Sequence, residues 1–245
     1  MPEGPSIVIL KEELAGFKGK KILAASGNSK KIDLKRLKGQ VILDLKTWGK
    51  NLFICFPTFT VRIHLMLFGS YRINEKKNAK PRLSLRFANN KSFQFYACVV
   101  QLLEEPLDEL YDWSADVMNS EWDSRQALKK LRSQPDTMVC DALLDQAIFA
   151  GVGNIIKNEV LFITRIHPES IIGKIPAPKL RQLVKETVRY AFQFLEWKKE
   201  FTLRKHWLAH TKTTCPRDHI PFIKAWLGKT DRRSFFCPVC QKIYV

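Results

Sequence analysis

The sequence predicts an α+β protein: an N-terminal antiparallel β-sandwich with a leading helix, then a helical region that ends in a metal-binding β-hairpin. Three observations support this prediction. Strand-like runs fill residues 41–96, helical periodicity fills residues 123–199, and three of the six cysteines lie close together near the C-terminus. The predicted domains are residues 1–115, 120–205 and 206–245.

Composition favours a soluble protein with a polyanionic partner. The 245 residues and 45% hydrophobic content are enough for one large core or two smaller ones. Forty-one Lys and Arg against 24 Asp and Glu give a net charge of +17, which suits nucleic acid, although ribosomal and membrane-surface proteins share this bias. No apolar run approaches the ~20 residues of a membrane span, and no signal-peptide pattern is present. We therefore expect an intracellular, cytoplasmic protein.

The first five residues, Met1 to Pro5, have features of a catalytic N-terminus. Removal of Met1, normal before a small residue, would give Pro2 the free α-amine. An N-terminal amine has a pKa near ~8, so part of it is unprotonated at neutral pH and can attack a carbon to form an iminium. Glu3 would stand beside it as a proton donor or acceptor. An ordinary start followed by a turn explains the same residues, so the rest of the chain must decide.

The N-terminal region reads as one helix followed by strands. Apolar residues at Ile7, Leu10, Leu14 and Phe17 predict an amphipathic helix. Turn residues such as Asn89 and Asn90 then separate short alternating runs, which predict an antiparallel sandwich or barrel. The expected strands are residues 41–45, 52–56, 61–65, 83–87 and 92–96.

The C-terminal half reads as helices joined by short turns. An acidic stretch at residues 105–122 marks the crossing into it, and helices are expected at 123–133, 138–148, 154–163 and 177–199. Before the third helix, Gly151 and Gly153 allow a tight turn whose amides can approach a phosphate, and Asn154 can add a side-chain amide. A simple inter-helix turn explains the glycines equally well.

The last forty residues carry a metal-site pattern. Cys215 and His219 are followed, after 17 residues, by Cys237 and Cys240. Three thiolates and one imidazole suit a tetrahedral structural zinc, with Asp218 or His210 as alternative fourth ligands. Four cations lie between the two pairs, either on a solvated face or against DNA: Lys224, Lys229, Arg232 and Arg233.

Together these motifs resemble the formamidopyrimidine-DNA glycosylase and endonuclease VIII family of base-excision repair enzymes. The resemblance covers nearly the whole chain. It rests on five matches in the right order: Met1 to Pro5, Gly49-Lys50, Leu144-Asp145-Gln146 with Gly151 to Asn154, His167-Pro168, and Cys237 to Gln241.

The resemblance implies roles for individual residues. Pro2 is the expected nucleophile at C1′ of the damaged nucleotide, Glu3 its acid/base partner, and Lys50 a phosphate-binding lysine that assists catalysis. Asn154, in a helix-two-turn-helix element, and Arg232, in the zinc-finger hairpin, are expected to bind phosphate. The implied partner is damaged double-stranded DNA, bound by a monomer at the nucleoid, with one structural Zn²⁺ and no membrane.

Two departures from the family pattern bear on the substrate. Ser6 replaces a glutamate that most members carry near the extruded base. Val99 and Val100 stand about where the oxidised-purine branch has an arginine. By contrast, the run Met66-Leu67-Phe68 resembles the apolar wedge of the endonuclease VIII branch, suited to filling the gap left by a flipped base.

The sequence thus predicts a bifunctional DNA glycosylase and lyase that removes oxidised bases, chiefly pyrimidines, and cleaves the abasic strand by β,δ-elimination. An enzyme for oxidised purines is the alternative within the family. A damaged-DNA-binding protein with weakened catalysis is the alternative that Ser6 suggests, and Pro2, Glu3 and Lys50 argue against it. A zinc-stabilised RNA-binding protein would leave the N-terminal motif unexplained.

Overall fold

The structure is a computed structural model that describes residues 2–245, so the predicted removal of Met1 lies outside the described residues. The chain divides into two units, Met1–Tyr111 and Asp112–Val245, and each has its own apolar core. Within the described range, no helix combines the length and apolarity needed to cross a membrane.

The first helix, α1 (Gly4–Leu14), starts as soon as the N-terminal motif allows. Glu3 takes the extended N-cap conformation, and Pro5 lies in the first turn, where its missing N–H costs nothing. Ile7, Leu10 and Leu14 are fully buried. This stripe packs α1 against β2 (Asp44–Trp48) and β3 (Asn51–Cys55), and a 3₁₀ turn at Ala15–Phe17 follows.

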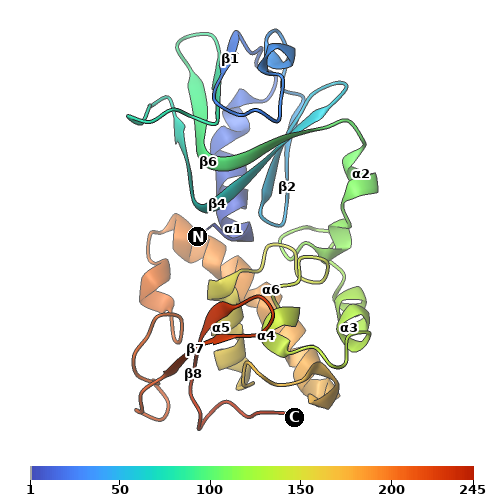
Figure 1. Cartoon of the computed structure of the whole chain (residues 1–245), viewed down its shortest axis with the longest axis vertical. Coiled ribbons are helices and arrows are strands. Elements are labelled where there is room, and N and C mark those ends of the chain that lie inside the picture. The colour runs from blue at the N-terminus through green and yellow to red at the C-terminus, as the bar shows by residue number, and fades with distance from the viewer. Residues whose placement is uncertain (1) are drawn as a thin grey trace. The chain divides into compact units, whose positions relative to one another are not determined.

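Six antiparallel strands form one sheet in the order β1-β5-β6-β4-β3-β2, which confirms the predicted β fold of the N-terminal unit (Figure 1). The long central pair is β4 (Thr60–Ile73) and β6 (Ser92–Leu103), and β5 (Leu83–Arg86) adds to β6. The sequence pattern missed β1 (Ala24–Ser26), whose three residues are too few to show alternation. A register shift between Leu65 and Ser70 interrupts the β4–β6 pairing.

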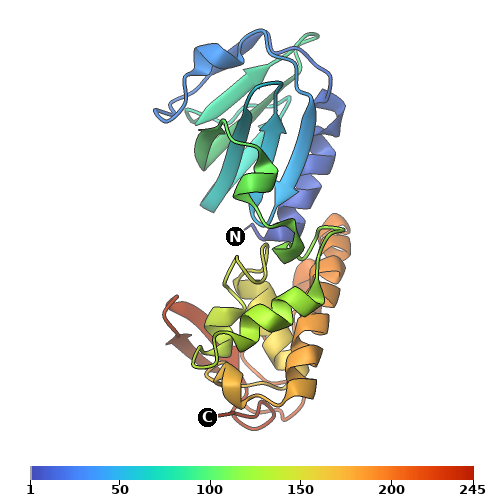
Figure 2. The same cartoon turned by 90° about the vertical axis from the view of Figure 1, so that its right-hand side faces the viewer.

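The second unit is helical, as predicted. Its helices are α3 (Ser124–Arg132), α4 (Val139–Ala142), α5 (Asn154–Thr164) and α6 (Ala177–Lys199). The helix α5 packs against α6, and Figure 2 shows α3 beside α6.

The expected helix at residues 138–148 is wrong in length, because polar side chains compete with helical hydrogen bonds after Ala142. The Asp145 carboxylate accepts from the Ala147 amide at 2.9 Å. The side chain of Gln146 accepts from the Gly151 amide and donates to the Val152 carbonyl, both at 3.1 Å. These bonds hold residues 143–153 in turns rather than in a helix.

The chain ends in the predicted hairpin, formed by β7 (Ile223–Leu227) and β8 (Arg232–Phe236). The strand β8 lies against α5 (Figure 1). The buried ammonium of Lys157 donates to the Ser234 hydroxyl at 2.8 Å, and the Asn158 side-chain oxygen accepts from the Phe235 amide at 3.2 Å. Buried polar bonds of this kind fix the hairpin in one register on the helix.

Candidate functional site

The N-terminal motif folds into a defined position at the start of α1. Pro2 is partly exposed, whereas the side chain of Glu3 is completely buried. The Glu3 carbonyl accepts from the amide of Ser6 at 2.8 Å, which ties the motif to the first helical turn. A fully buried carboxylate is rare outside structural pairs and functional sites. Glu3 directly follows the partly exposed Pro2 in the chain, so a buried carboxylate and an accessible proline adjoin at the start of α1.

Lys50 lies in the two-residue turn between β2 and β3. Gly49 adopts a φ of 55°, and Trp48 pairs with Asn51 across the turn. Tight hairpins need this left-handed conformation, which glycine adopts without steric cost. Since α1 packs against both strands, Lys50 and the Pro2–Glu3 segment belong to neighbouring elements of one unit.

The structure adds His64, a residue that the sequence analysis missed. His64 pairs with Asn51 in the β3–β4 register, and its Nδ1 lies 3.1 Å from the Asn51 side-chain oxygen. Burial first, and then the positive charges of Arg62 and Lys50, lower the pKa of His64, so the ring is neutral at neutral pH. In the sequence, Arg62 and His64 alternate with apolar residues along β4. This alternation was the signal that could have identified His64 as part of a polar face.

The wedge residues protrude where β4 loses its register with β6. Met66, Leu67 and Phe68 are 49%, 51% and 83% exposed, and Ala97 opposite them adopts a φ of 48°. Gly69 closes this bulge: a Cβ there would lie 2.8 Å from the Met66 nitrogen. Three adjacent apolar side chains held out from a sheet are available for insertion between bases.

The segment of β6 that follows Ala97 is a continuous strand. Cys98 and Val100 are buried in the core of the first unit, and Val99 pairs with His64. The sequence lacks the arginine of the oxidised-purine branch at Val99 and Val100. The described residues 92–103 form a strand and contain no loop that could carry such an arginine.

Asn154 is the first residue of α5 and is only 9% exposed. Its side-chain nitrogen donates to the backbone carbonyl of Arg233 at 2.9 Å. Among the described residues its side-chain oxygen has no hydrogen-bond partner. The predicted phosphate-binding residue thus also connects the helix start to the hairpin.

Arg232, the other predicted phosphate contact, starts β8 and is exposed. It faces Leu227 across the hairpin. The hydrogen bond from the Asn154 side chain to the Arg233 carbonyl places the start of α5 next to Arg232. The structure therefore brings the two predicted phosphate contacts into one area of the second unit.

A separate cluster joins the two ends of the hairpin region. Ligand atoms of Cys215, Asp218, Cys237 and Cys240 all lie within 4.8 Å of one another. The fourth member differs from the prediction, because Asp218 takes the place expected for His219. Asp218 follows Cys215 with the same two-residue spacing that separates Cys237 from Cys240, and His219 is an exposed residue with a φ of 56°.

The alternative ligand His210 lies elsewhere. Its ring nitrogen is 3.2 Å from the side-chain nitrogen of Asn158 on α5. Burial, followed by the positive charge of Lys157, lowers the pKa of His210 to about 4. His210 therefore belongs to the contact between α5 and the chain that precedes the hairpin, and not to the cysteine cluster.

The geometry of the cluster fits a tetrahedral zinc. Two thiolates at a Zn–S distance of about 2.3 Å lie about 3.8 Å apart in a tetrahedron. The sulfurs of Cys215 and Cys240 are 3.8 Å apart. A carboxylate oxygen should lie about 3.5 Å from each sulfur, and that of Asp218 is 3.4 Å from Cys215 and 3.1 Å from Cys237. The donor set is three thiols and one carboxylate.

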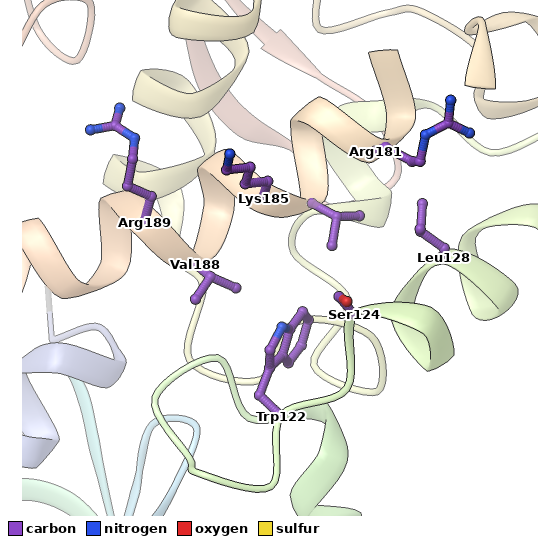
Figure 3. A pocket seen from close by; sticks show the side chains of 8 residues that line it. Trp122, Ser124, Leu128, Arg181, Lys185, Val188 and Arg189 are labelled. Carbon is purple, nitrogen blue, oxygen red and sulfur yellow. The ribbon is translucent and has the colours of Figure 1, made fainter. Parts of the chain in front are cut away.

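A groove of about 510 Å³ lies between α6 and the segment that contains α3 (Figure 3). Trp122, Leu128 and Val188 line its apolar part, and Arg189 on its rim is paired with Glu186 at 2.6 Å. No residue that the sequence predicts for catalysis, DNA contact or metal binding lines this groove.

Comparison with known proteins agrees with this arrangement. The formamidopyrimidine-DNA glycosylase N-terminal domain matches residues 1–97, and the formamidopyrimidine-DNA glycosylase H2TH domain matches residues 114–202. Two solved structures share the fold over 98% of this chain. A viral DNA glycosylase has a TM-score of 0.87 at 23% identity, with all of its chain covered. The Lactococcus lactis formamidopyrimidine-DNA glycosylase bound to abasic-site DNA has a TM-score of 0.85 at 22% identity, with 99% covered.

The sequence relatives are endonuclease VIII-like. Endonuclease 8-like 3 of Xenopus laevis is 32% identical over 86% of this chain, and endonuclease 8-like 2 of Bos taurus is 34% identical over 74%. The chain spans only 36% and 58%, respectively, of the length of these two relatives. The DNA-(apurinic or apyrimidinic site) lyase Nei2 of Mycolicibacterium smegmatis is 26% identical over 98% of this chain and 99% of its own.

A six-stranded antiparallel sheet with a leading helix, followed by an H2TH unit and a cysteine-bearing hairpin, defines a glycosylase-type architecture. The chain belongs to the formamidopyrimidine-DNA glycosylase and endonuclease VIII family, and its relatives place it on the endonuclease VIII-like side.

Proposed function

We propose that the protein is a bifunctional DNA glycosylase and abasic-site lyase of base-excision repair, acting as a monomer on damaged duplex DNA within the nucleoid. The observation that carries this proposal is the buried Glu3 next to the partly exposed Pro2 at the start of α1. The names of the relatives, which include an abasic-site lyase, support the same reaction class.

In the proposed reaction, the Pro2 nitrogen attacks C1′ of the damaged nucleotide, and the base leaves with a proton. The nitrogen lone pair then forms an iminium with C1′ as the C1′–O4′ bond breaks and O4′ takes up a proton, which opens the sugar ring. The iminium acts as an electron sink. Loss of a proton from C2′ expels the 3′ phosphate by β-elimination, and a second elimination expels the 5′ phosphate. Glu3 is suited to the proton transfers because it lies next to the nucleophile in the sequence and is held inside the protein.

Lys50 is the phosphate-binding residue in this part of the site. It supplies a positive charge at the tight turn that Gly49 makes, and the neutral ring of His64 lies beside it. The one N–H of that ring is directed to the Asn51 side-chain oxygen at 3.1 Å, so His64 supports the turn and leaves the phosphate to Lys50.

In the second unit, Asn154 and Arg232 bind phosphates of the damaged strand, while Met66, Leu67 and Phe68 of the first unit fill the space of the extruded base. One Zn²⁺ held by Cys215, Asp218, Cys237 and Cys240 keeps the hairpin in shape. The metal has a structural role only, because four protein ligands leave no open position for a substrate.

Oxidised pyrimidines are the proposed substrates. The continuous strand β6 has no arginine-bearing loop that could contact the base opposite an oxidised purine, and the wedge is apolar. The test is a panel of duplexes, each with one lesion, in which base release and strand ends are analysed. The proposal requires base release followed by a product with a phosphate at both ends of the gap. Abasic-strand cleavage with no base release from any lesion would contradict it.

A further inference from the structure

One face of the terminal hairpin remains unused by the proposed reaction. Side chains alternate between the two faces of a strand, and residues paired across a hairpin point the same way. Trp226 pairs with Arg233, and Lys224 lies two residues before Trp226. We call the exposed residues Lys224, Trp226 and Arg233 the outer face. Phe235, which pairs with Lys224, lies on the same side but is buried, with its ring centre 5.4 Å from that of His210. Ser234, which pairs with Ala225 and bonds to Lys157, lies on the opposite face.

Trp226 is a large aromatic residue that lies largely in solvent. It is 59% exposed, although the guanidinium carbon of Arg233 lies 4.9 Å from its ring centre. The other large aromatic residues of the hairpin, Phe222, Phe235 and Phe236, are buried. A solvent-exposed indole lacks the favourable free energy that burial of its apolar surface in a core or an interface would give.

The hairpin holds this face in a fixed position. At its tip the Asp141 carboxylate accepts from the Lys229 amide at 2.9 Å and from the Thr230 amide at 3.0 Å. Gly228 is needed for this approach, because a Cβ would lie 2.4 Å from an Asp141 oxygen. Asn154 binds the other strand through the Arg233 carbonyl. A surface that is already ordered loses little conformational entropy when it binds.

The charge of the outer face selects an anionic ligand. Lys224 lies two residues before Trp226 on the same strand, Arg233 pairs with Trp226 across the hairpin, and both are exposed. Residues 222–236 contain four cations and one carboxylate, that of Asp231 at the tip. An aromatic ring with two cations beside it suits a nucleobase, which carries phosphates beside its own ring. Bases within a duplex stack on one another and expose only their edges, so the indole requires an unpaired base.

We propose that Lys224, Trp226 and Arg233 form a stacking platform for an unpaired base of single-stranded DNA. This inference rests on the proposed function only in taking DNA as the ligand. The platform would hold single-stranded DNA independently of the wedge and of Pro2. Base stacking on one aromatic side chain changes affinity by about tenfold.

The test compares two labelled strands of equal length by fluorescence anisotropy. One is an oligothymidylate, and the other carries tetrahydrofuran abasic units on the same phosphate backbone. Because tetrahydrofuran units are also ligands of the proposed abasic site, the readout is the affinity that each variant loses on each strand. Trp226→Ala should bind the oligothymidylate about tenfold more weakly than wild-type protein does and the abasic strand equally well. Trp226→Phe should lose less. Phe201→Ala is the matched control, because Phe201 is 95% exposed outside the hairpin.

Undiminished affinity of Trp226→Ala for the oligothymidylate, or an equal loss on both strands, would overturn the platform. Covalent trapping on an abasic duplex keeps this result separate from the proposed function. Trp226→Ala should retain trapping, since Trp226 lies outside the chemistry. Absence of trapping in wild-type protein, with the loss in Trp226→Ala confined to the oligothymidylate, would count against the repair reaction and not against the platform.

Discussion

The side-chain amide of Asn154 donates to the backbone carbonyl of Arg233 at 2.9 Å, so the first residue of α5 is bonded directly to the second strand of the hairpin. The Asn154 side-chain oxygen has no hydrogen-bond partner among the described residues, so the same position holds a buried acceptor that is not satisfied. The helix start and the hairpin are therefore joined within the second unit, at the place where we propose that phosphate binds.

Replacing Asn154 with Ala should weaken both stability and DNA binding. It removes one hydrogen bond from Arg233, although Asn158 still donates to the same carbonyl at 3.3 Å. We expect the free energy of unfolding to fall by about 1 kcal/mol, measured by urea denaturation, and duplex affinity to fall as well. Asn154→Asp is the matched variant: its added negative charge should reduce binding further by repelling phosphate. Undiminished affinity in both variants would remove Asn154 from the DNA surface.

Arg232→Ala should weaken DNA binding with little effect on folding, because its side chain is exposed. The slope of log affinity against log salt should fall by about 1 if a phosphate contact is lost. Arg181→Ala is the control, since it removes the same charge from the rim of the groove on α6. An equal change of slope in both variants would show that only net charge matters.

The metal site is tested by replacing each of the two candidate fourth ligands, Asp218 and His219, with Ala. Purified protein should contain about one equivalent of zinc, and Cys237→Ser should release it. Asp218→Ala should lose most of the metal, while His219→Ala should keep it, as measured by elemental analysis of protein never exposed to chelator. The reverse result for Asp218 and His219, or zinc-free wild-type protein, would reject the site as drawn.

Leu67→Ala should slow base excision from a duplex far more than cleavage of a pre-formed abasic site in a single strand, where no stack has to open.

The apolar wedge cannot donate hydrogen bonds to the orphaned base, so discrimination among opposite bases should be weak. Oxidised pyrimidines should be removed faster than 8-oxoguanine opposite cytosine. Rates with 8-oxoguanine above those of every oxidised pyrimidine would contradict the substrate preference.

Most of the fold follows from patterns that local physics enforces. The stripe of Leu180, Leu183 and Val184 predicts α6 with its observed bounds, because a 23-residue helix repeats its buried face many times. The helix expected after residue 138 ended early for a reason that periodicity does not show, namely the side-chain bonds of Asp145 and Gln146 to the backbone.

The candidate site was predictable where the residue type and its spacing in the sequence together indicate a function. Cysteine spacing located the metal cluster, but histidine was preferred to aspartate as the fourth ligand on residue type alone. Only the turn after Cys215 shows that the third following residue, Asp218, meets the sulfurs. His64 and the Asn154–Arg233 bond depend on strand register and on pairing over 79 positions, which a single sequence does not reveal.

The most direct test of the proposed chemistry is borohydride trapping on a duplex with one abasic site. Protein that starts at Pro2 should form a covalent adduct, and peptide mapping should place the DNA on Pro2. The same chain with a short extension before Pro2, whose nitrogen is then an amide, should form almost none, and Pro2→Gly should be strongly weakened. Binding to a tetrahydrofuran abasic duplex serves as the control for folding. Full trapping by the extended chain, or an adduct mapped to Lys50, would contradict the N-terminal nucleophile.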